Sequence, residues 1–133
     1  MNARAIAIAS TAASLLAFPA AAHHSFAMFD QQKLVTLTGT VKNFEWVNPH
    51  SWIYLMVADD NGAPKQWAIE MGSPAQTSRI GWRPDIIKPG AEVTIKGFRG
   101  REASQNRGML RELTTADGKT YGMFGPQEGP EAK

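Results

Sequence analysis

The stretch that decides the fold runs from Leu37 to Val57 and reads LTGTVKNFEWVNPHSWIYLMV. It predicts two β-strands joined by a tight corner at Asn48-Pro49-His50, because proline fixes its own φ and keeps the preceding residue out of the α region. The run Trp52–Val57 is almost wholly apolar and rich in β-branched and aromatic residues, which is typical of a strand buried on both faces. The corner also carries His50, one of only three histidines in the chain.

Residues 1–22 have the pattern of a secretory signal peptide, with Arg4 near the start, an apolar stretch, and small residues before His23. The apolar stretch is too short to span a bilayer, so we expect no transmembrane segment in the mature protein. Ala20 and Ala22 occupy the small-residue positions for cleavage before His23, which predicts a periplasmic protein. Cleavage one residue earlier would leave Ala22 first but would place Pro19 at a recognition position.

The mature chain, residues 23–133, is long enough for one modest domain with one core. Loss of the signal peptide removes only Arg4 from a total net charge of +2. This near balance gives no general attraction to nucleic acid, and we expect no nucleic-acid partner. The chain has no cysteine, so its stability must come from packing or from a bound ligand or metal.

Alternating and apolar runs predict five strands, and turn signals separate them. Gly39 lies inside the first strand and marks a bulge or bend. Asp59–Gly62 forms a hairpin turn. Ser73 and Pro74 begin a helix over Ala75–Ile80 as its N-cap and first residue. The five strands are expected at Val35–Trp46, His50–Val57, Gln66–Met71, Glu92–Phe98 and Met109–Thr115, followed by a short run at Thr120–Phe124.

Three strands, a helix and two more strands predict an all-β domain with one short helix, arranged as a five-stranded OB-fold-like Greek-key barrel. An up-and-down barrel or an open sandwich would use the same elements. We expect an N-terminal arm over 23–34, the OB-like β-barrel domain over 35–124, and a disordered tail over 125–133. The expected core residues are Trp46, Ile53, Leu55, Trp67, Ile69, Val93, Ile95 and Leu110.

Several short motifs occur in a recognisable order along the chain: HHSF after the signal peptide, WVNPH before a strand, WAIEMGSP, and then GW. In this order the chain resembles a family of small exported bacterial proteins of unassigned function. The resemblance implies export and an OB-like barrel. It implies no activity.

The histidines suggest a metal site. If His23 is the first residue of the mature chain, its α-amine and imidazole chelate one ion, and a further imidazole from His50 or His24 completes three nitrogen ligands. Such a nitrogen-rich set suits copper as Cu(II) best and Ni(II) next. If Ala22 is first instead, His24 becomes the third residue and completes a square-planar site with the amine and two amides. The ordinary alternative is an exposed histidine pair, with His50 bonded within its own turn.

A second hypothesis is a binding face for an anionic or sugar-like ligand, because OB barrels often bind ligands across their second and third strands. The residues proposed for it are Trp52, Trp67, Arg99, Arg101 and Arg107, from a set of four tryptophans and a basic cluster that also holds Lys96 and Arg111. A protein partner in the cell envelope is a third possibility.

The sequence gives little support for catalysis. Ser25 beside His24 lacks a third orienting group, and the chain has no phosphate-binding loop, dinucleotide fingerprint or zinc-type spacing. Glu70 has no carboxylate partner in the pattern, and we expect it to form a structural salt bridge with an arginine. We therefore expect a binding protein and not an enzyme.

Overall fold

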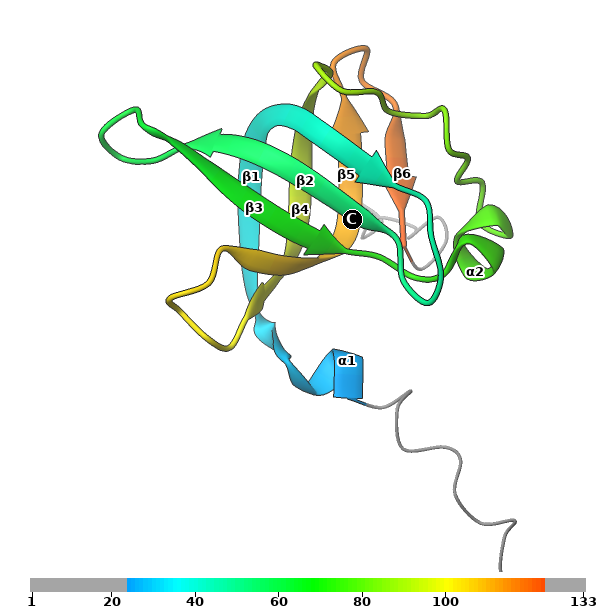
Figure 1. The fold of residues 1–133 in the computed structure, drawn as a ribbon, viewed down its shortest axis with the longest axis horizontal. Helices are drawn as coiled ribbons and strands as arrows, with labels where there is room; N and C mark the ends of the chain where they lie inside the picture. Colours follow the sequence, from blue (N-terminus) through cyan, green and yellow to red (C-terminus); the bar gives the residue numbers. More distant parts are fainter. Residues whose placement is uncertain (1–23, 124–133) are drawn as a thin grey trace, which may run out of the picture.

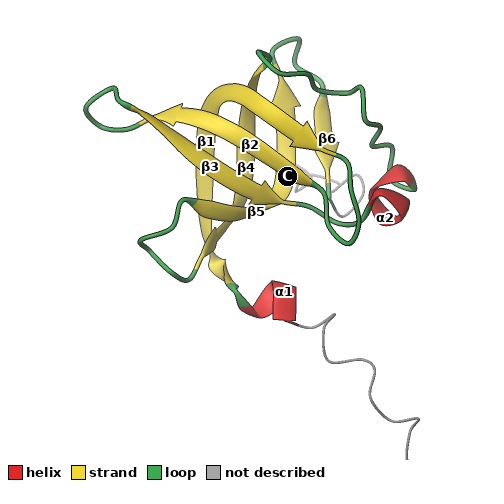
Figure 2. Ribbon diagram, viewed as in Figure 1, coloured by secondary structure: helices red, strands yellow, loops and turns green. Residues whose placement is uncertain are grey.

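β-Strands make up most of residues 24–123, which are the residues that the computed structural model describes (Figures 1 and 2). The predicted signal peptide, His23 and the predicted tail lie outside them. The elements are α1 (His24–Ala27), β1 (Phe29–Glu45), β2 (Trp52–Ala58), β3 (Pro64–Glu70), α2 (Pro74–Ser78), β4 (Glu92–Gly100), β5 (Arg107–Thr115) and β6 (Thr120–Gly122).

The strands form one sheet in the order β3-β2-β1-β4-β5-β6, in which all neighbours are antiparallel. A further, parallel pairing joins β3 to β5, with Ala68 opposite Arg107 and Glu70 opposite Met109. This pairing links β1, β2, β3, β5 and β4 into a ring and leaves β6 outside it. The expected β-rich class is confirmed. The expected short helix is α2, and α1 is an additional single turn.

The long strand β1 pairs with β4 along most of its length and with β2 near its end. It begins at Phe29 and not at Val35, so part of the expected N-terminal arm belongs to the sheet. Figure 1 shows that β1 curves strongly between its pairing with β4 and its pairing with β2. A Cβ at Gly39 would overlap the backbone carbonyl of Met56, and the register shifts between Val41 and Asn43. The expected bend near Gly39 is therefore present, because only glycine lets the backbones of β1 and β2 approach so closely.

The core lies inside the ring and contains seven of the eight residues expected there. The eighth, Trp46, is half-buried and packs against the core. The expectation that Trp52–Val57 is buried on both faces is wrong. Ile53 and Leu55 are fully buried, but Trp52 and Tyr54 on the opposite face are only half-buried. Successive side chains of a strand point to opposite faces, and only one face of β2 meets the core.

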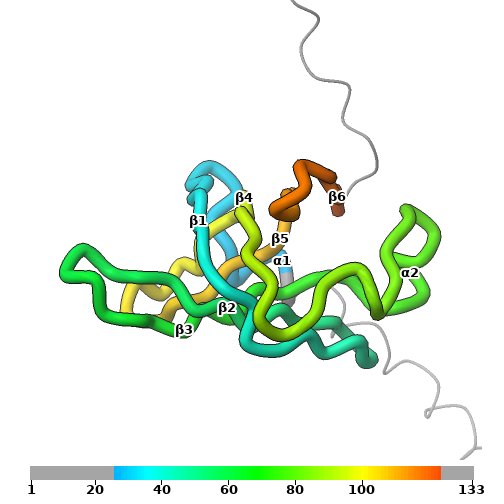
Figure 3. Tube along the Cα trace, turned by 90° about the horizontal axis from the view of Figure 1, so that it is seen from above, coloured from blue at the N-terminus to red at the C-terminus, as the bar shows by residue number. Residues whose placement is uncertain are grey.

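The helix α2 and the chain after it cover one end of the core. Ser73 caps the helix as expected, and it forms a reciprocal capping box with Gln76. Trp82 is fully buried and donates its indole hydrogen to the carbonyl of Gly122 at 3.0 Å. In Figures 1 and 3, α2 lies on the side of the sheet that carries β6. The tryptophan thus ties this segment to the last strand.

No helix within residues 24–123 is long and apolar enough to cross a membrane.

We expect Gly39→Ala to lower the free energy of unfolding by roughly 3 kcal/mol, because the added methyl forces the backbones of β1 and β2 apart. Gly62→Ala is the matched control: its φ is +79°, but nothing lies near the new Cβ. It should cost only about 1 kcal/mol of conformational energy. Urea denaturation measures both values. Equal losses would contradict the close approach at Gly39.

Candidate functional site

Glu70 is a buried carboxylate at the end of β3, with only 3% of its surface exposed. Its Oε1 lies 2.6 Å from Nδ1 of His50, and its Oε2 lies 3.0 Å from Nη2 of Arg107. The expected salt bridge between Glu70 and an arginine is therefore confirmed. The carboxylate joins three parts of the chain: the corner after β1, the end of β3 and the start of β5.

The strand register places these groups together. Glu70 is opposite Trp52 on β2, and Arg107 is opposite Ala68 on β3, two residues before Glu70. Residues two apart on a strand share a face, so Arg107 and Glu70 lie on the same, outer face of the sheet. The corner is fixed by Ser51, which is buried. Its backbone N–H donates to the carbonyl of Gly72 at 3.1 Å, and its carbonyl accepts from the N–H of Met71 at 2.9 Å. Because His50 directly precedes Ser51, these hydrogen bonds also fix the position of His50.

The two ring nitrogens of His50 differ in their contacts with Glu70. Nδ1 of His50 is the ring nitrogen that faces Glu70 Oε1, and Nε2 is the ring nitrogen that does not take part in this contact. The side chain is 36% exposed. A carboxylate that orients a histidine through the nitrogen not used for binding is the usual outer shell of a histidine metal ligand. The contact between His50 and the buried carboxylate of Glu70 resembles such a pair.

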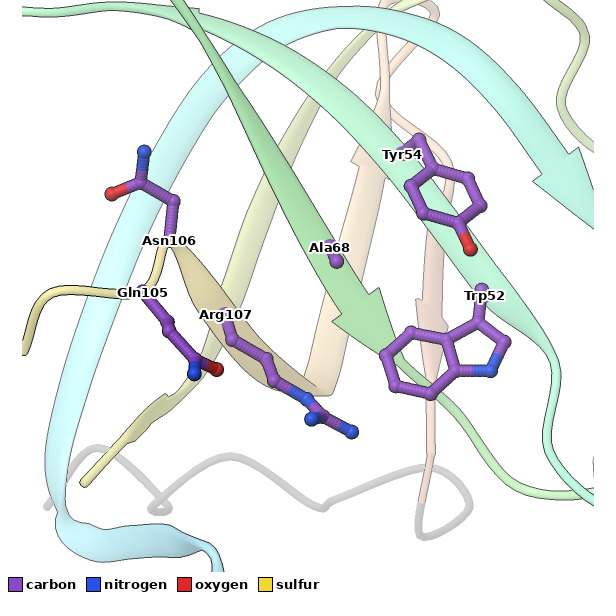
Figure 4. Close-up of a pocket in the computed structure, with 6 residues that line it drawn as sticks. All are labelled: Trp52, Tyr54, Ala68, Gln105, Asn106 and Arg107. Atoms are coloured by element: carbon purple, nitrogen blue, oxygen red, sulfur yellow. The ribbon is translucent and has the colours of Figure 1, made fainter. Parts of the chain in front are cut away.

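Beside this cluster lies a pocket of about 390 Å³, open to solvent, formed by β2, β3 and the start of β5 (Figure 4). Ala68 is the smallest residue in its wall. The guanidinium carbon of Arg107 lies 4.9 Å from the centre of the Trp52 ring, within cation–π distance. Nε of Arg107 is buried and has no hydrogen-bond partner among residues 24–123. The pocket is lined by Trp52, Tyr54, Ala68, Gln105, Asn106 and Arg107.

Tyr54 brings a polar group to the edge of the pocket. Its hydroxyl donates a hydrogen bond to Oε2 of Glu45 at 3.3 Å. Burial raises the pKa of Tyr54 above its ordinary value of 10.0, the charge of Glu45 and this hydrogen bond raise it further, and the charge of Arg107 opposes them. The phenol therefore stays neutral, and able to donate, throughout the physiological range.

The sequence-predicted metal ligands are only partly placed. His50 is part of the cluster, His24 begins α1, and His23 lies outside the described residues. Within residues 24–123, no group of three or more His, Cys, Asp or Glu side chains is arranged to hold a metal ion. Any complete site therefore needs ligands beyond His50 and Glu70.

The residues of the second hypothesis do not form one surface. Trp52 and Arg107 line the pocket, but Trp67 belongs to the core on the opposite face of the sheet and is buried. Arg99 stacks on the Trp67 ring at 4.8 Å. Arg101 donates to the carbonyl of Ala27 at 3.0 Å and so holds the segment after α1. The expected aromatic pair is thus divided between two faces.

Sequence reasoning did not select Tyr54 and Gln105 as site residues. Tyr54 was detectable, because it lies two positions from Trp52 and must share its face. Gln105 was not, because it comes to the pocket through the pairing of β3 with β5, which leaves no local pattern in the sequence.

A family described as a family of unknown function (DUF6152) matches residues 11–110. The chain belongs to this family. The matched range contains the whole cluster around Glu70 and every residue of the pocket. No curated protein matches the chain. Membership in DUF6152 supports the resemblance found in the sequence and assigns no activity.

In this DUF6152 protein we expect Arg107→Met to lower the free energy of unfolding by about 2 kcal/mol, because it removes the arginine that pairs with the buried carboxylate of Glu70. The loss is smaller than for a fully buried pair, since Arg107 is partly exposed. The double variant Glu70→Gln, Arg107→Met should recover part of it, because no buried charge remains.

The control is Lys96→Met, which breaks the exposed pair with Glu112 at 3.2 Å. It should cost less than about 1 kcal/mol. Chemical denaturation of the wild type, Arg107→Met, the double variant and Lys96→Met measures these losses, and an Arg107→Met loss no larger than that of Lys96→Met would contradict the role of the buried pair.

We expect the phenol of Tyr54 to ionise above pH 10, measured as the absorbance titration that Tyr54→Phe removes. Glu45→Gln should lower this midpoint, because it removes the negative charge beside the hydroxyl. Since the folded pKa exceeds the unfolded one, this contribution to stability is complete below the unfolded pKa and is lost as pH rises through the folded pKa. A midpoint at or below 10 would exclude the described environment.

Proposed function

We propose that this protein is an exported, periplasmic binding protein that holds Cu(II) through His50 and the α-amine and imidazole of a mature N-terminal His23. It acts as a carrier or buffer and not as an oxidase. The observation that carries the proposal is the contact between Nδ1 of His50 and the buried carboxylate of Glu70 at 2.6 Å. Copper bound there would take nitrogen ligands in a tetragonal arrangement, which suits Cu(II).

The cluster supplies the orientation that a histidine ligand needs. Arg107 binds one carboxylate oxygen of Glu70, and His50 binds the other. The carboxylate is thus held from both sides, and the ring of His50 can direct Nε2 away from the protein interior. Outer-shell carboxylates of this kind typically change metal affinity 10- to 100-fold.

The attachment of the N-terminal segment is the second support. Arg101 holds the carbonyl of Ala27, and Phe29 is buried with its ring 5.8 Å from the guanidinium carbon of Arg107. Arg107 in turn binds Glu70, which binds His50. The chain just after His23 is therefore anchored to the same cluster that orients the proposed ligand.

The finer fold belongs to the same proposal. The ring order β1-β2-β3-β5-β4, with α2 between β3 and β4, is the arrangement expected of an OB-like barrel, and we propose that architecture. The signal-peptide pattern of residues 1–22 supports export to the periplasm. A cell-envelope protein that gives or receives copper is the kind of partner such a carrier requires.

The deciding experiment compares Cu(II) binding by a protein that begins at His23 with one that carries an extra N-terminal Met-Gly. The extension removes the α-amine from His23 and leaves every side chain in place, so affinity should fall and the copper spectrum should change. Because the amine and imidazoles must lose protons to bind metal, affinity should also weaken as pH falls. Equal affinity and identical spectra for the two forms would exclude the terminal chelate.

The role of the cluster is tested with Glu70→Gln and His50→Ala. Glu70→Gln should weaken Cu(II) binding on the order of tenfold. The matched control is Glu112→Gln, which changes an exposed carboxylate on β5 and should leave affinity unchanged. Unchanged binding in His50→Ala, with loss in His24→Ala, would move the site to the N-terminal segment alone.

A further inference from the structure

We propose that the pocket between Trp52, Tyr54 and Arg107 binds a neutral saccharide. The site is separate from the copper ligands, and the proposal does not depend on copper binding. It rests on the shape of the pocket, on its aromatic and hydrogen-bonding groups, and on the way the charges around it are paired.

The pocket offers an aromatic surface beside a hollow. Trp52 and Tyr54 project from the same face of β2 and are both half-buried, so their rings remain partly accessible. Ala68 stands opposite Tyr54 on β3, and its single methyl leaves the space that a larger side chain would fill. Figure 4 shows Arg107, at the start of β5, extending toward the side on which Trp52 lies, with Gln105 beside it from the preceding loop. Aromatic rings with a few placed polar groups are the usual lining of a small-molecule site.

The polar groups suit hydroxyls. Gln105 donates from Nε2 to Glu102 at 2.8 Å, which leaves its amide oxygen to accept. The neutral phenol of Tyr54 donates its hydrogen to Glu45, so its oxygen can accept. A saccharide hydroxyl can donate to both oxygens, so one ligand can engage Gln105 and Tyr54 while its C–H face rests on a ring.

The charges favour a neutral ligand over an anion. Arg107 is neutralised by Glu70, and the carboxylate of Glu45 lies beside Tyr54. Three other basic residues of the cluster are engaged elsewhere: Lys96 pairs with Glu112, Arg99 stacks on Trp67, and Arg101 holds Ala27. No surplus positive charge therefore faces the pocket from these residues, and a sulfate or phosphate group would meet two carboxylates nearby.

The experiment follows the indole signals of the four tryptophans by NMR, with Trp52 identified by Trp52→Phe. The probes are cellotriose and chitotriose as neutral saccharides, glucose 6-phosphate as an anion, and uridine as a nucleoside, all with a chelator present. At least one neutral saccharide should shift the Trp52 signal saturably, and added salt should not weaken it, because no charge attraction contributes. The result should be the same in His50→Ala, which separates this site from copper binding.

Ala68→Leu fills the hollow and should weaken saccharide binding on the order of tenfold or more. Gln66→Leu adds the same side chain to the same face of β3 outside the pocket and should bind normally. Gln105→Ala, an exposed change in the loop before β5, serves as the second pocket variant and should also weaken binding.

Four outcomes would overturn the proposal. The first is the absence of a Trp52 shift with either saccharide, and the second is a shift that persists in both Ala68→Leu and Gln105→Ala. The third is salt-sensitive binding of glucose 6-phosphate alone, and the fourth is binding of uridine alone.

Discussion

The carboxylate of Glu70 is the constraint on which the rest of the site depends. A buried carboxylate is strongly unfavourable unless cationic or hydrogen-bonding partners compensate it. Arg107 and His50 provide that compensation from two different segments of the chain. The need to pair one buried charge therefore fixes the start of β5 against the end of β3, and it fixes the corner between β1 and β2 against both.

This arrangement explains why the two candidate binding regions are neighbours. Arg107 lies between Glu70 and the ring of Trp52, so the residue that compensates the buried charge is also part of the pocket wall. On the other side of Glu70, the side chain of His50 contacts the second carboxylate oxygen and is 36% exposed. The pocket and His50 are separate surfaces, but both contact the pair formed by Glu70 and Arg107. A change in either residue of this pair therefore alters both surfaces.

Local chemistry made much of the fold predictable. The turn at Asp59–Gly62 closes as expected, with a backbone hydrogen bond from Gly62 to Asp59 at 2.9 Å. The N-cap at Ser73 and the bend near Gly39 follow from rules that act over a few residues. The burial of Trp52–Val57 was misjudged because composition alone does not tell how many faces of a strand are covered. The early start of β1 was missed because Asp30-Gln31-Gln32 has no apolar pattern, and its pairing with β4 is non-local.

The sequence by itself determined the β-rich class, the short helix, most of the core, and the expectation that Glu70 would bind an arginine. Each depends on hydrophobic periodicity, on turn and cap residues, or on the cost of burying a charge. Only the tertiary structure decided which arginine it would be, because Arg107 lies 37 residues further along the chain than Glu70. The parallel pairing of β3 with β5 brings them together, and no local pattern encodes such a pairing. The same pairing gave Trp52 and Arg107 a common pocket. The register of β2 with β3 placed Trp52 and Trp67 on opposite faces, and the backbone bonds of Ser51 brought His50 to the buried carboxylate.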